Sequence, residues 1–286
     1  KNIFIPFFGY NRIREYANEK PPFRSELFTE EQLEKYPVTL AKSHADVNES
    51  TVELLLKRLA ENEDILMDVH GMLTQSVKQN NRVIPAGEWL LDNFYLVEEQ
   101  IYMAKKHLPK GYSKGLPQLL HGDNAGYPRV YAIAVEIISH TDGRVALGNL
   151  TGFINAYQSV MPLLLGELWA VPIMLRLALI ENLRRIAIQI AIDIESKNHA
   201  NFWVDEMMDT QENDPKNLVL VIADMTRANP PMDSSFIAEF TRRLQEKGTA
   251  MALPLNWIEQ RIAESGFTTA AMINMENQAQ AADQLS

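Results

Sequence analysis

Apolar residues recur at every third or fourth position along most of this chain, and such spacing is typical of α-helices rather than strands. The clearest run consists of Val52, Leu55, Leu59, Leu66, Val69, Leu73 and Val77. It predicts one long helix, or two in line, over residues 43–79. Pro85 is well placed to begin the next helix, whose apolar stripe ends before Pro109 and Gly111. We therefore expect an all-α fold, a globular array of helices joined by short loops.

Proline and glycine divide the middle of the chain. A loop rich in both residues covers 110–127, and Pro128 begins a helix directly after it. A long helical run follows over residues 165–208, and Pro172 is expected to kink or divide it. The centre of the fold is therefore predicted to lie within residues 87–191.

The last part of the chain is predicted to consist of short helices. The polar segment 198–215 is a candidate hinge before them, and residues 219–222 would also suit a strand. We expect an extended or irregular segment over 1–42, a main helical domain over 43–209 and a C-terminal helical subdomain over 210–286.

Residues 161–180 form a nearly continuous apolar run that is about as long as a membrane span. The run contains the charged residues Glu167 and Arg176 and the prolines Pro162 and Pro172. Charges and prolines make a spanning helix costly in free energy. A buried core helix is the favoured interpretation, and we expect no membrane span here.

Charge and cysteine content exclude several classes of protein. A net charge of −10 argues against broad electrostatic binding to nucleic acid or to an anionic membrane surface. The absence of cysteine excludes disulfides and thiolate metal sites. Because the chain begins at Lys1 without Met, we expect it to be a piece of a longer polypeptide.

One helix carries a row of carboxylates and tyrosines on the side away from its apolar stripe. Glu88, Asp92, Tyr95, Glu99 and Tyr102 share this face. Carboxylates one turn apart beside tyrosines can bind sugar hydroxyls or act as acid and base. The alternative is a solvated face, or a face that pairs with arginines of a neighbouring helix.

The loop from His121 to Arg129 is the most unusual segment of the sequence. Its glycines allow a close approach of the backbone, and Arg129 falls in the first turn of a helix whose free N–H groups favour an anion. In the alternative interpretation the loop packs a helix and Arg129 pairs with an acid. No phosphate-loop motif supports the first interpretation.

Three charged residues lie in or beside the long apolar run. Glu167 and Arg176 flank Pro172, and Glu181 can pair with Arg184 or Arg185 at a spacing of three or four residues. Charges in apolar surroundings are normally paired, so a buried structural network is expected first and a ligand site second.

Motifs of catalysis and metal binding are absent from the sequence. The six histidines are dispersed, and no nucleophile elbow, dinucleotide fingerprint, phosphate loop or Asp-x-Asp pattern is present. We therefore predict no metal site and assign no catalytic residue.

Several blocks of the sequence resemble cyclic β-1,2-glucan synthases. In order, the blocks are 22–28 (PFRSELF), 31–34 (EQLE), 89–94 (WLLDNF), 97–101 (VEEQI), 126–131 (GYPRVY), 140–143 (HTDG), 166–170 (GELWA), 174–185 (MLRLALIENLRR), 257–261 (WIEQR) and 280–284 (QAADQ). The likeness covers roughly residues 21–286.

The resemblance implies that the chain is the N-terminal region of a large glucosyltransferase at the bacterial inner membrane. Such an enzyme takes glucose from UDP-glucose, builds a linear β-1,2-glucan and releases it as a ring. Its glycosyltransferase, membrane-spanning, cyclisation and phosphorylase-like parts would follow this region, which would be a soluble part on the cytoplasmic side. No cofactor and no catalytic residue are implied for the region itself.

Three functions follow as hypotheses. The preferred one is an accessory or regulatory role beside the glucosyltransferase, with the other domains of the polypeptide, and β-1,2-glucan, as partners. The second is a carbohydrate-active or glucan-binding module, since aromatic faces beside polar groups suit glucose units. The third is an intramolecular scaffold. The candidate binding residues are Glu88, Trp89, Asp92, Tyr95, Glu99, Tyr127, Arg129, Tyr131, Glu167, Trp169, Arg176 and Glu181.

Overall fold

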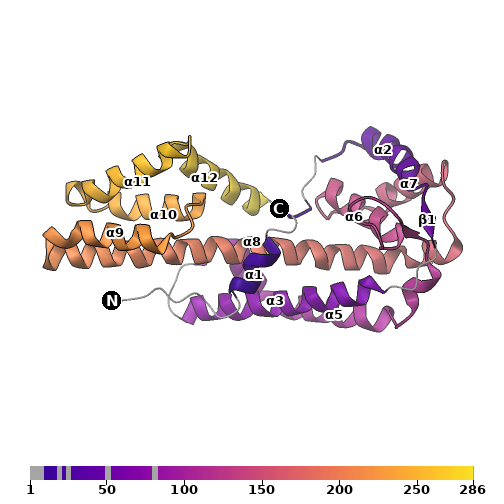
Figure 1. The fold of residues 1–286 in the computed structure, drawn as a ribbon. Helices are drawn as coiled ribbons and strands as arrows, with labels where there is room; N and C mark the ends of the chain where they lie inside the picture. Colours follow the sequence, from indigo (N-terminus) through magenta and orange to yellow (C-terminus); the bar gives the residue numbers. More distant parts are fainter. Residues whose placement is uncertain (1–9, 18–20, 24–26, 49–52, 79–82, 286) are drawn as a thin grey trace. The chain divides into compact units, whose positions relative to one another are not determined.

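A computed structural model of the chain describes residues 10–17, 21–23, 27–48, 53–78 and 83–285. Helices dominate this part of the chain, and the predicted all-α fold is confirmed (Figure 1). The α-helices are α1 (Tyr10–Ala17), α2 (Glu30–Ser43), α3 (Leu54–Lys78), α4 (Pro85–Asp92), α5 (Phe94–His107), α6 (Arg129–Thr141), α7 (Leu147–Gln158), α8 (Leu165–Asn213), α9 (Leu218–Ala228), α10 (Ser234–Gln245), α11 (Ala252–Glu264) and α12 (Thr269–Leu285). Short 3-10 helices cover Tyr112–Gly115, Pro215–Asn217 and Gly248–Met251.

Two strands of two residues each form a small antiparallel sheet. β1 (Val47–Asn48) pairs with β2 (Gln118–Leu119), and Val47 lies opposite Leu119. A strand of this length has no alternation of polar and apolar residues that could reveal it in the sequence. The stretch 219–222, which also suited a strand, is helical and belongs to α9.

The chain divides into two compact units, each assembled from segments that are distant in sequence. The first unit comprises residues 1–14, 72–89 and 189–286, and the second comprises 15–71 and 90–188. The expected ranges 1–42, 43–209 and 210–286 differ from these units, and they stay a prediction about independently folding domains.

The core of the first unit lies among α9–α12 and the last turns of α8 (Figure 1). Phe236 and Phe240 of α10 are fully buried and stack with 5.5 Å between ring centroids. They are surrounded by Met207, Met225 and Ile258 from the neighbouring helices. Burial of one phenylalanine side chain stabilises a fold by about 2–3 kcal/mol. The two buried rings of α10 therefore anchor the C-terminal helices.

The core of the second unit lies among α2, α6 and α7. Leu40 of α2, Ile137 of α6 and Phe153 and Tyr157 of α7 are buried together. α2 begins at a capping box in which the Thr29 hydroxyl accepts the backbone N–H of Gln32 and the Gln32 side chain accepts that of Thr29. This local signal fixes where α2 begins.

Three sequence predictions about elements are corrected. Residues 10–17 and 30–43 are helical, although we expected 1–42 to be extended or irregular, because α1 and α2 each have an apolar face to bury. The helix expected over 43–79 begins only at Leu54, because β1 takes residues 47–48. The candidate hinge 198–215 is helical as far as Asn213. Of the two alternatives for Pro172, a kink or a division of the long helix, division does not occur, since α8 continues through it.

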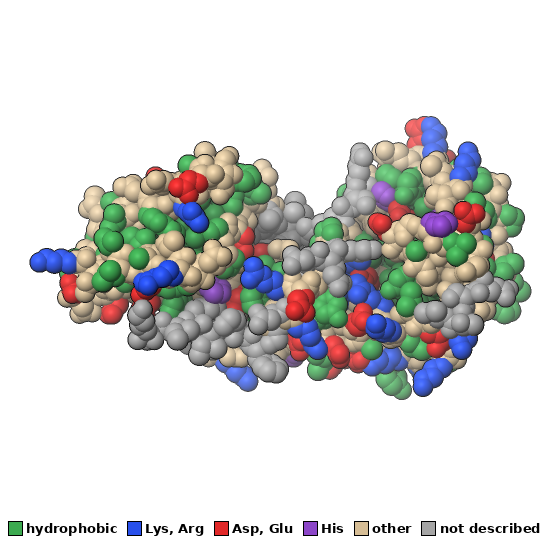
Figure 2. Space-filling model, viewed as in Figure 1, with side chains coloured by type: hydrophobic (Ala, Val, Ile, Leu, Met, Phe, Trp, Pro, Cys, Tyr) green, Lys and Arg blue, Asp and Glu red, His purple; other side chains and the backbone are tan. Residues whose placement is uncertain are grey.

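Figure 2 shows one face of the molecule, where hydrophobic side chains are exposed over the α9–α12 helices. The exposed side chains in this part of the chain include Leu253, Phe267 and Met275. Within the described residues, no helix combines the length and the apolar character that crossing a membrane requires.

Candidate functional site

A pocket of about 390 Å³ lies in the second unit. Helix α3 contributes Arg58, α6 contributes Tyr131, and α8 contributes Glu181 and Arg185. The loop before α6 and a short N-terminal segment complete the lining, which consists of Phe23, Arg58, Asp123, Asn124, Tyr127, Tyr131, Glu181 and Arg185. Charged, polar and aromatic side chains thus converge on one hollow, as they do in small-molecule sites.

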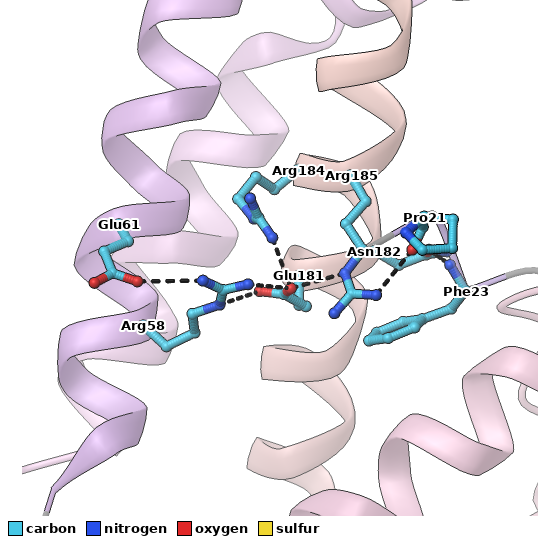
Figure 3. Close-up of polar contacts among 8 residues, drawn as sticks. All are labelled: Pro21, Phe23, Arg58, Glu61, Glu181, Asn182, Arg184 and Arg185. Atoms are coloured by element: carbon cyan, nitrogen blue, oxygen red, sulfur yellow. Dashed lines mark hydrogen bonds and ion pairs between the residues drawn. The ribbon is translucent and has the colours of Figure 1, made fainter. Parts of the chain in front are cut away.

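Glu181 is the centre of the polar contacts in this pocket (Figure 3). Arg58 donates from Nε and Nη2 to the two carboxylate oxygens, each at 2.9 Å. Arg184 donates at 2.9 Å from Nη2, and Arg185 donates at 2.8 Å from Nε. Glu61 accepts a further bond from Arg58 at 3.3 Å. One buried carboxylate therefore holds three guanidinium groups in place.

This arrangement keeps Glu181 ionised. Burial alone would raise the pKa of its carboxyl, but the hydrogen bonds and charges of Arg58 and Arg184 outweigh burial and hold the pKa well below its usual range. The same pairing raises the pKa of Arg58 against the opposing effect of burial. With its oxygens engaged by four N–H groups, Glu181 is poorly suited to act as a general acid or base.

A segment near the N-terminus crosses the helix next to Glu181. The Phe23 N–H donates to Oδ1 of Asn182 at 2.7 Å, and Nη1 of Arg185 donates to the Pro21 carbonyl at 2.8 Å. The guanidinium of Arg185 also lies over the Phe23 ring, 4.1 Å from its centroid. Figure 3 shows Pro21 and Phe23 on the side of Arg185 opposite to Arg58.

The loop before α6 is shaped by two glycines in the left-handed region, Gly122 (φ 85°) and Gly126 (φ 82°). The Gly126 N–H donates to the Leu119 carbonyl at 2.8 Å, and the Tyr127 carbonyl accepts from the Leu119 N–H at 3.0 Å. The loop therefore folds back on β2, and this return brings Asp123 and Asn124 to the pocket.

Several polar groups that line the pocket have no partner from the protein. Among the residues that the structure describes, the hydroxyls of Tyr127 and Tyr131 make no hydrogen bond, and neither does the side-chain amide of Asn124. Nη2 of Arg185 also makes no hydrogen bond to these residues, because Nε donates to Glu181 and Nη1 donates to the Pro21 carbonyl. Tyr131 and Arg185 are only 5% and 8% exposed, and burial raises the pKa of the Tyr131 hydroxyl.

Arg129 and Glu167 form a separate buried pair in the second unit. Arg129 donates to the two oxygens of Glu167 at 3.0 and 2.6 Å, and Glu167 also accepts the Leu164 N–H at 2.8 Å. Glu167 is fully buried and Arg129 is 4% exposed. The alternative in which Arg129 pairs with an acid is therefore confirmed, and its guanidinium is committed to a carboxylate rather than to an anionic ligand.

The other candidate residues lie outside the pocket. Glu88, Trp89 and Asp92 are exposed on α4, and Tyr95 and Glu99 are exposed on α5. On α8, Trp169 is 73% exposed and Arg176 is half-buried. A break at Asn93 separates α4 from α5, and the face that was expected to carry Glu88, Asp92, Tyr95, Glu99 and Tyr102 is exposed. A binding role for these residues stays a prediction.

The structure thus brings Tyr127, Tyr131 and Glu181 together, and it adds residues that sequence reasoning had not selected. The predicted pairing of Glu181 with Arg184 and Arg185 is confirmed. Arg58 was missed because it lies 123 positions from Glu181 and no local pattern links them. Phe23, Asp123 and Asn124 all lay in segments already marked as unusual or family-like. Across the described residues, no group of three or more His, Asp or Glu side chains is arranged to hold a metal ion.

Comparison with known proteins identifies the relatives of this chain. Over 209 residues it is 32% identical to the cyclic β-(1,2)-glucan synthase NdvB of Rhizobium meliloti (strain 1021). The resemblance to cyclic β-1,2-glucan synthases is confirmed. The matched residues make up 73% of this chain but 7% of the relative, so the chain corresponds to a small part of such a synthase. No protein-family model matches the chain.

Proposed function

We propose that this chain is an accessory, non-catalytic region of a cyclic β-1,2-glucan synthase. The observation that carries the proposal is the state of Glu181, the buried carboxylate of the pocket, which three arginines hold ionised and fully hydrogen-bonded. A carboxylate in this state orients neighbouring side chains but does not exchange protons with a substrate. The pocket is therefore built for binding or for support.

The complete polypeptide would be a glucosyltransferase that uses UDP-glucose as donor and acts at the bacterial inner membrane. The similarity to NdvB, of which this chain matches 7%, supports this context. In it, the chain lies N-terminal to the glycosyltransferase part and on the cytoplasmic side. The remaining domains of the same polypeptide are its first partners, and β-1,2-glucan is the second.

A turnover assay tests the non-catalytic role. The chain is incubated with radiolabelled UDP-glucose and, separately, with linear β-1,2-glucan, and products are separated by chromatography. We expect neither release nor transfer of glucose, and no shortening of the glucan. Turnover that disappears in Glu181→Gln would contradict the proposal and assign catalysis to the pocket.

A scaffold role is the second candidate, and exposed apolar side chains favour it. Leu147, Leu164, Leu165 and Trp169 are 78%, 58%, 60% and 73% exposed. Leu164, Leu165 and Trp169 lie close together in sequence at the beginning of α8, and large exposed apolar groups often mark protein contacts. In the complete synthase, Trp169→Glu would then lower glucan synthesis, while the unfolding temperature of the isolated chain would stay unchanged.

A further inference from the structure

We propose that the pocket binds a short segment of β-1,2-linked glucan, and that Asn124, Tyr127, Tyr131 and Arg185 hydrogen-bond its hydroxyl groups. This inference rests on the proposed function for the identity of the sugar. The binding groups themselves follow from the geometry of the pocket.

Polar groups of the pocket wall that have no partner from the protein are the first argument. Polar groups that line a pocket and bond to nothing else in the protein are available to a ligand that enters it. In the described residues, the hydroxyls of Tyr127 and Tyr131, the Asn124 amide and Nη2 of Arg185 have none from the protein. These groups offer both donors and acceptors, which is what a sugar hydroxyl requires of its surroundings.

Charge balance is the second argument, and it separates a neutral sugar from an anion. A phosphate site normally has an excess of arginine or lysine over carboxylate. Here the arginines in and next to the pocket are matched in number by carboxylates: Arg58, Arg184 and Arg185 against Glu61, Glu181 and Asp123. The pocket therefore has no net charge that would attract the diphosphate of a nucleotide sugar.

Fixed geometry is the third argument. Arg185 is held by Glu181 at 2.8 Å, by the Pro21 carbonyl at 2.8 Å and by the Phe23 ring, so its remaining nitrogen has a fixed direction. Groups already ordered before binding lose less entropy when a ligand arrives. Glu181 and Arg58 act here as positioning residues, because their hydrogen bonds are used within the protein.

Size and aromatic lining are the fourth argument. The rings of Tyr127 and Tyr131 lie 5.2 Å apart at an interplanar angle of 31°. Aromatic rings with a polar tip pack against apolar faces of a ligand while their hydroxyls bond to its polar groups. A volume of 390 Å³ lies near the lower end of the ~300–1,000 Å³ typical of ligand pockets, which suits a short segment rather than a long stretch of polymer.

Calorimetric titration of the chain with short linear β-1,2-glucooligosaccharides tests the proposal. We expect saturable binding, and a dissociation constant about three- to tenfold higher for Tyr131→Phe, the loss expected when one net hydrogen bond is removed. Because the Tyr131 hydroxyl bonds to no described protein group, this variant should fold normally, which circular dichroism and thermal unfolding verify. Asn124→Ala, on the loop, provides a second variant with the same expected direction.

Matched controls decide between the pocket and other surfaces. Tyr112→Phe makes the same chemical change outside the pocket and should leave the affinity unchanged. Linear β-1,3-glucooligosaccharides of equal length should bind more weakly, and UDP-glucose should bind more weakly still.

Four results would overturn the proposal. These are no binding of β-1,2-glucooligosaccharides by the folded chain, preferred binding of UDP-glucose or equal binding of β-1,3-linked chains, and affinity that falls in Tyr95→Phe on α5 but not in Tyr131→Phe. Such a failure remains distinct from failure of the accessory role, because that role is contradicted by turnover and not by absence of binding.

Discussion

Arg129 and Glu167 illustrate how single charged residues are accommodated in the second unit. Glu167 is fully buried, and its carboxylate accepts two bonds from Arg129 and one from the Leu164 N–H at the beginning of α8. The last of these bonds satisfies one of the N–H groups that a helix leaves free at its N-terminus. The pair therefore joins α6 to the beginning of α8.

Removing one member of this pair is expected to destabilise the protein strongly. Glu167→Ala leaves the Arg129 guanidinium buried without its carboxylate, a change that costs about 3–5 kcal/mol of unfolding free energy in comparable cases. The control is Glu264→Ala, which breaks an ion pair with Arg261 whose side chains are 51% and 55% exposed. That variant should stay within about 0.5 kcal/mol of the wild type. Urea unfolding of both variants gives the comparison, and equal losses would contradict the assigned role of burial.

At the residue scale, the sequence predicted those charge contacts that are local. Glu181 meets Arg184 and Arg185 because residues three and four apart share a helix face, and this is independent of tertiary structure. Arg58 and the partner of Arg129 could not be predicted, since each contact joins different helices. The candidate pocket was therefore visible in the sequence as Glu181, Tyr127 and Tyr131, without the residues that complete it.

The entry of the chain into α4 shows how tightly one element packs in the first unit. A Cβ atom added at Gly87 would lie 2.6 Å from Cγ1 of Val83 and 3.2 Å from Cδ2 of Leu73. Val83 and Leu73 are both buried, so neither has free space into which to move. Glycine at position 87 is thus required by close packing rather than by backbone conformation.

Two glycine-to-alanine changes in helices are expected to have opposite effects. Gly87→Ala forces a methyl group into occupied space, and such overpacking costs about 1–3 kcal/mol. Gly71→Ala in α3 meets nothing within 4 Å, and it should stabilise the chain by about 0.5–1 kcal/mol through helix propensity. Thermal unfolding of the two variants tests whether the first change lowers stability and the second raises it. A stabilising effect of Gly87→Ala would show that Val83 is free to move away.

A polar cluster connects three helices in the first unit. Asp193 of α8 accepts from Ser235 of α10 at 3.1 Å, and Ser235 also donates to Glu276 of α12 at 2.8 Å. Lys197 pairs with Glu276 at 2.8 Å. Burial, followed by the negative charge of Glu276, raises the pKa of Asp193 to about 6.

The raised pKa of Asp193 predicts a pH-dependent stability. A carboxyl whose pKa is higher in the folded state binds its proton more tightly there, so its contribution to stability is greatest below pH 4 and is lost as pH rises through 6. Asp193→Asn should therefore stabilise the protein by about 1–3 kcal/mol at pH 8 and have little effect at pH 4. Asp209→Asn, at an exposed position of the same helix, should change the free energy of unfolding by less than about 0.5 kcal/mol at both pH values. Chemical unfolding at the two pH values tests this prediction. An equal increase in unfolding free energy for Asp193→Asn at both pH values would contradict the titration of Asp193.

At the element scale, helix positions followed from the sequence wherever a local signal marked their ends. Pro85 begins α4 as expected, and α5 ends at His107, just before Pro109. The interruption at Asn93 and the passage of α8 through Pro172 have no such marker. A helix continues through proline where packing on either side outweighs the lost hydrogen bond, and that packing is a tertiary property.

At the scale of the whole molecule, the described residues include two hydrophobic cores that are built from different helices. Phe240 is fully buried in the core of the first unit, and Phe153 is 1% exposed in the core of the second. The sequence predicted helices throughout but not this division, because the units combine distant segments and their boundaries fall inside α1, α3, α4 and α8. A division that runs through continuous helices leaves no linker composition to detect.

Reciprocal substitutions test whether the two cores are energetically separate. Phe240→Ala and Phe153→Ala each remove a buried ring and should each lower the unfolding free energy by about 3–5 kcal/mol. Phe267→Ala, at a side chain that is 51% exposed, is the matched control and should change it by less than about 1 kcal/mol. In hydrogen exchange, Phe240→Ala should accelerate exchange in α10 and α11 more than in α6 and α7, since local opening follows the contacts that were lost. Phe153→Ala should show the reverse. Equal acceleration in both sets of helices, whichever ring is removed, would show that α3 and α8 couple the cores into one cooperative structure.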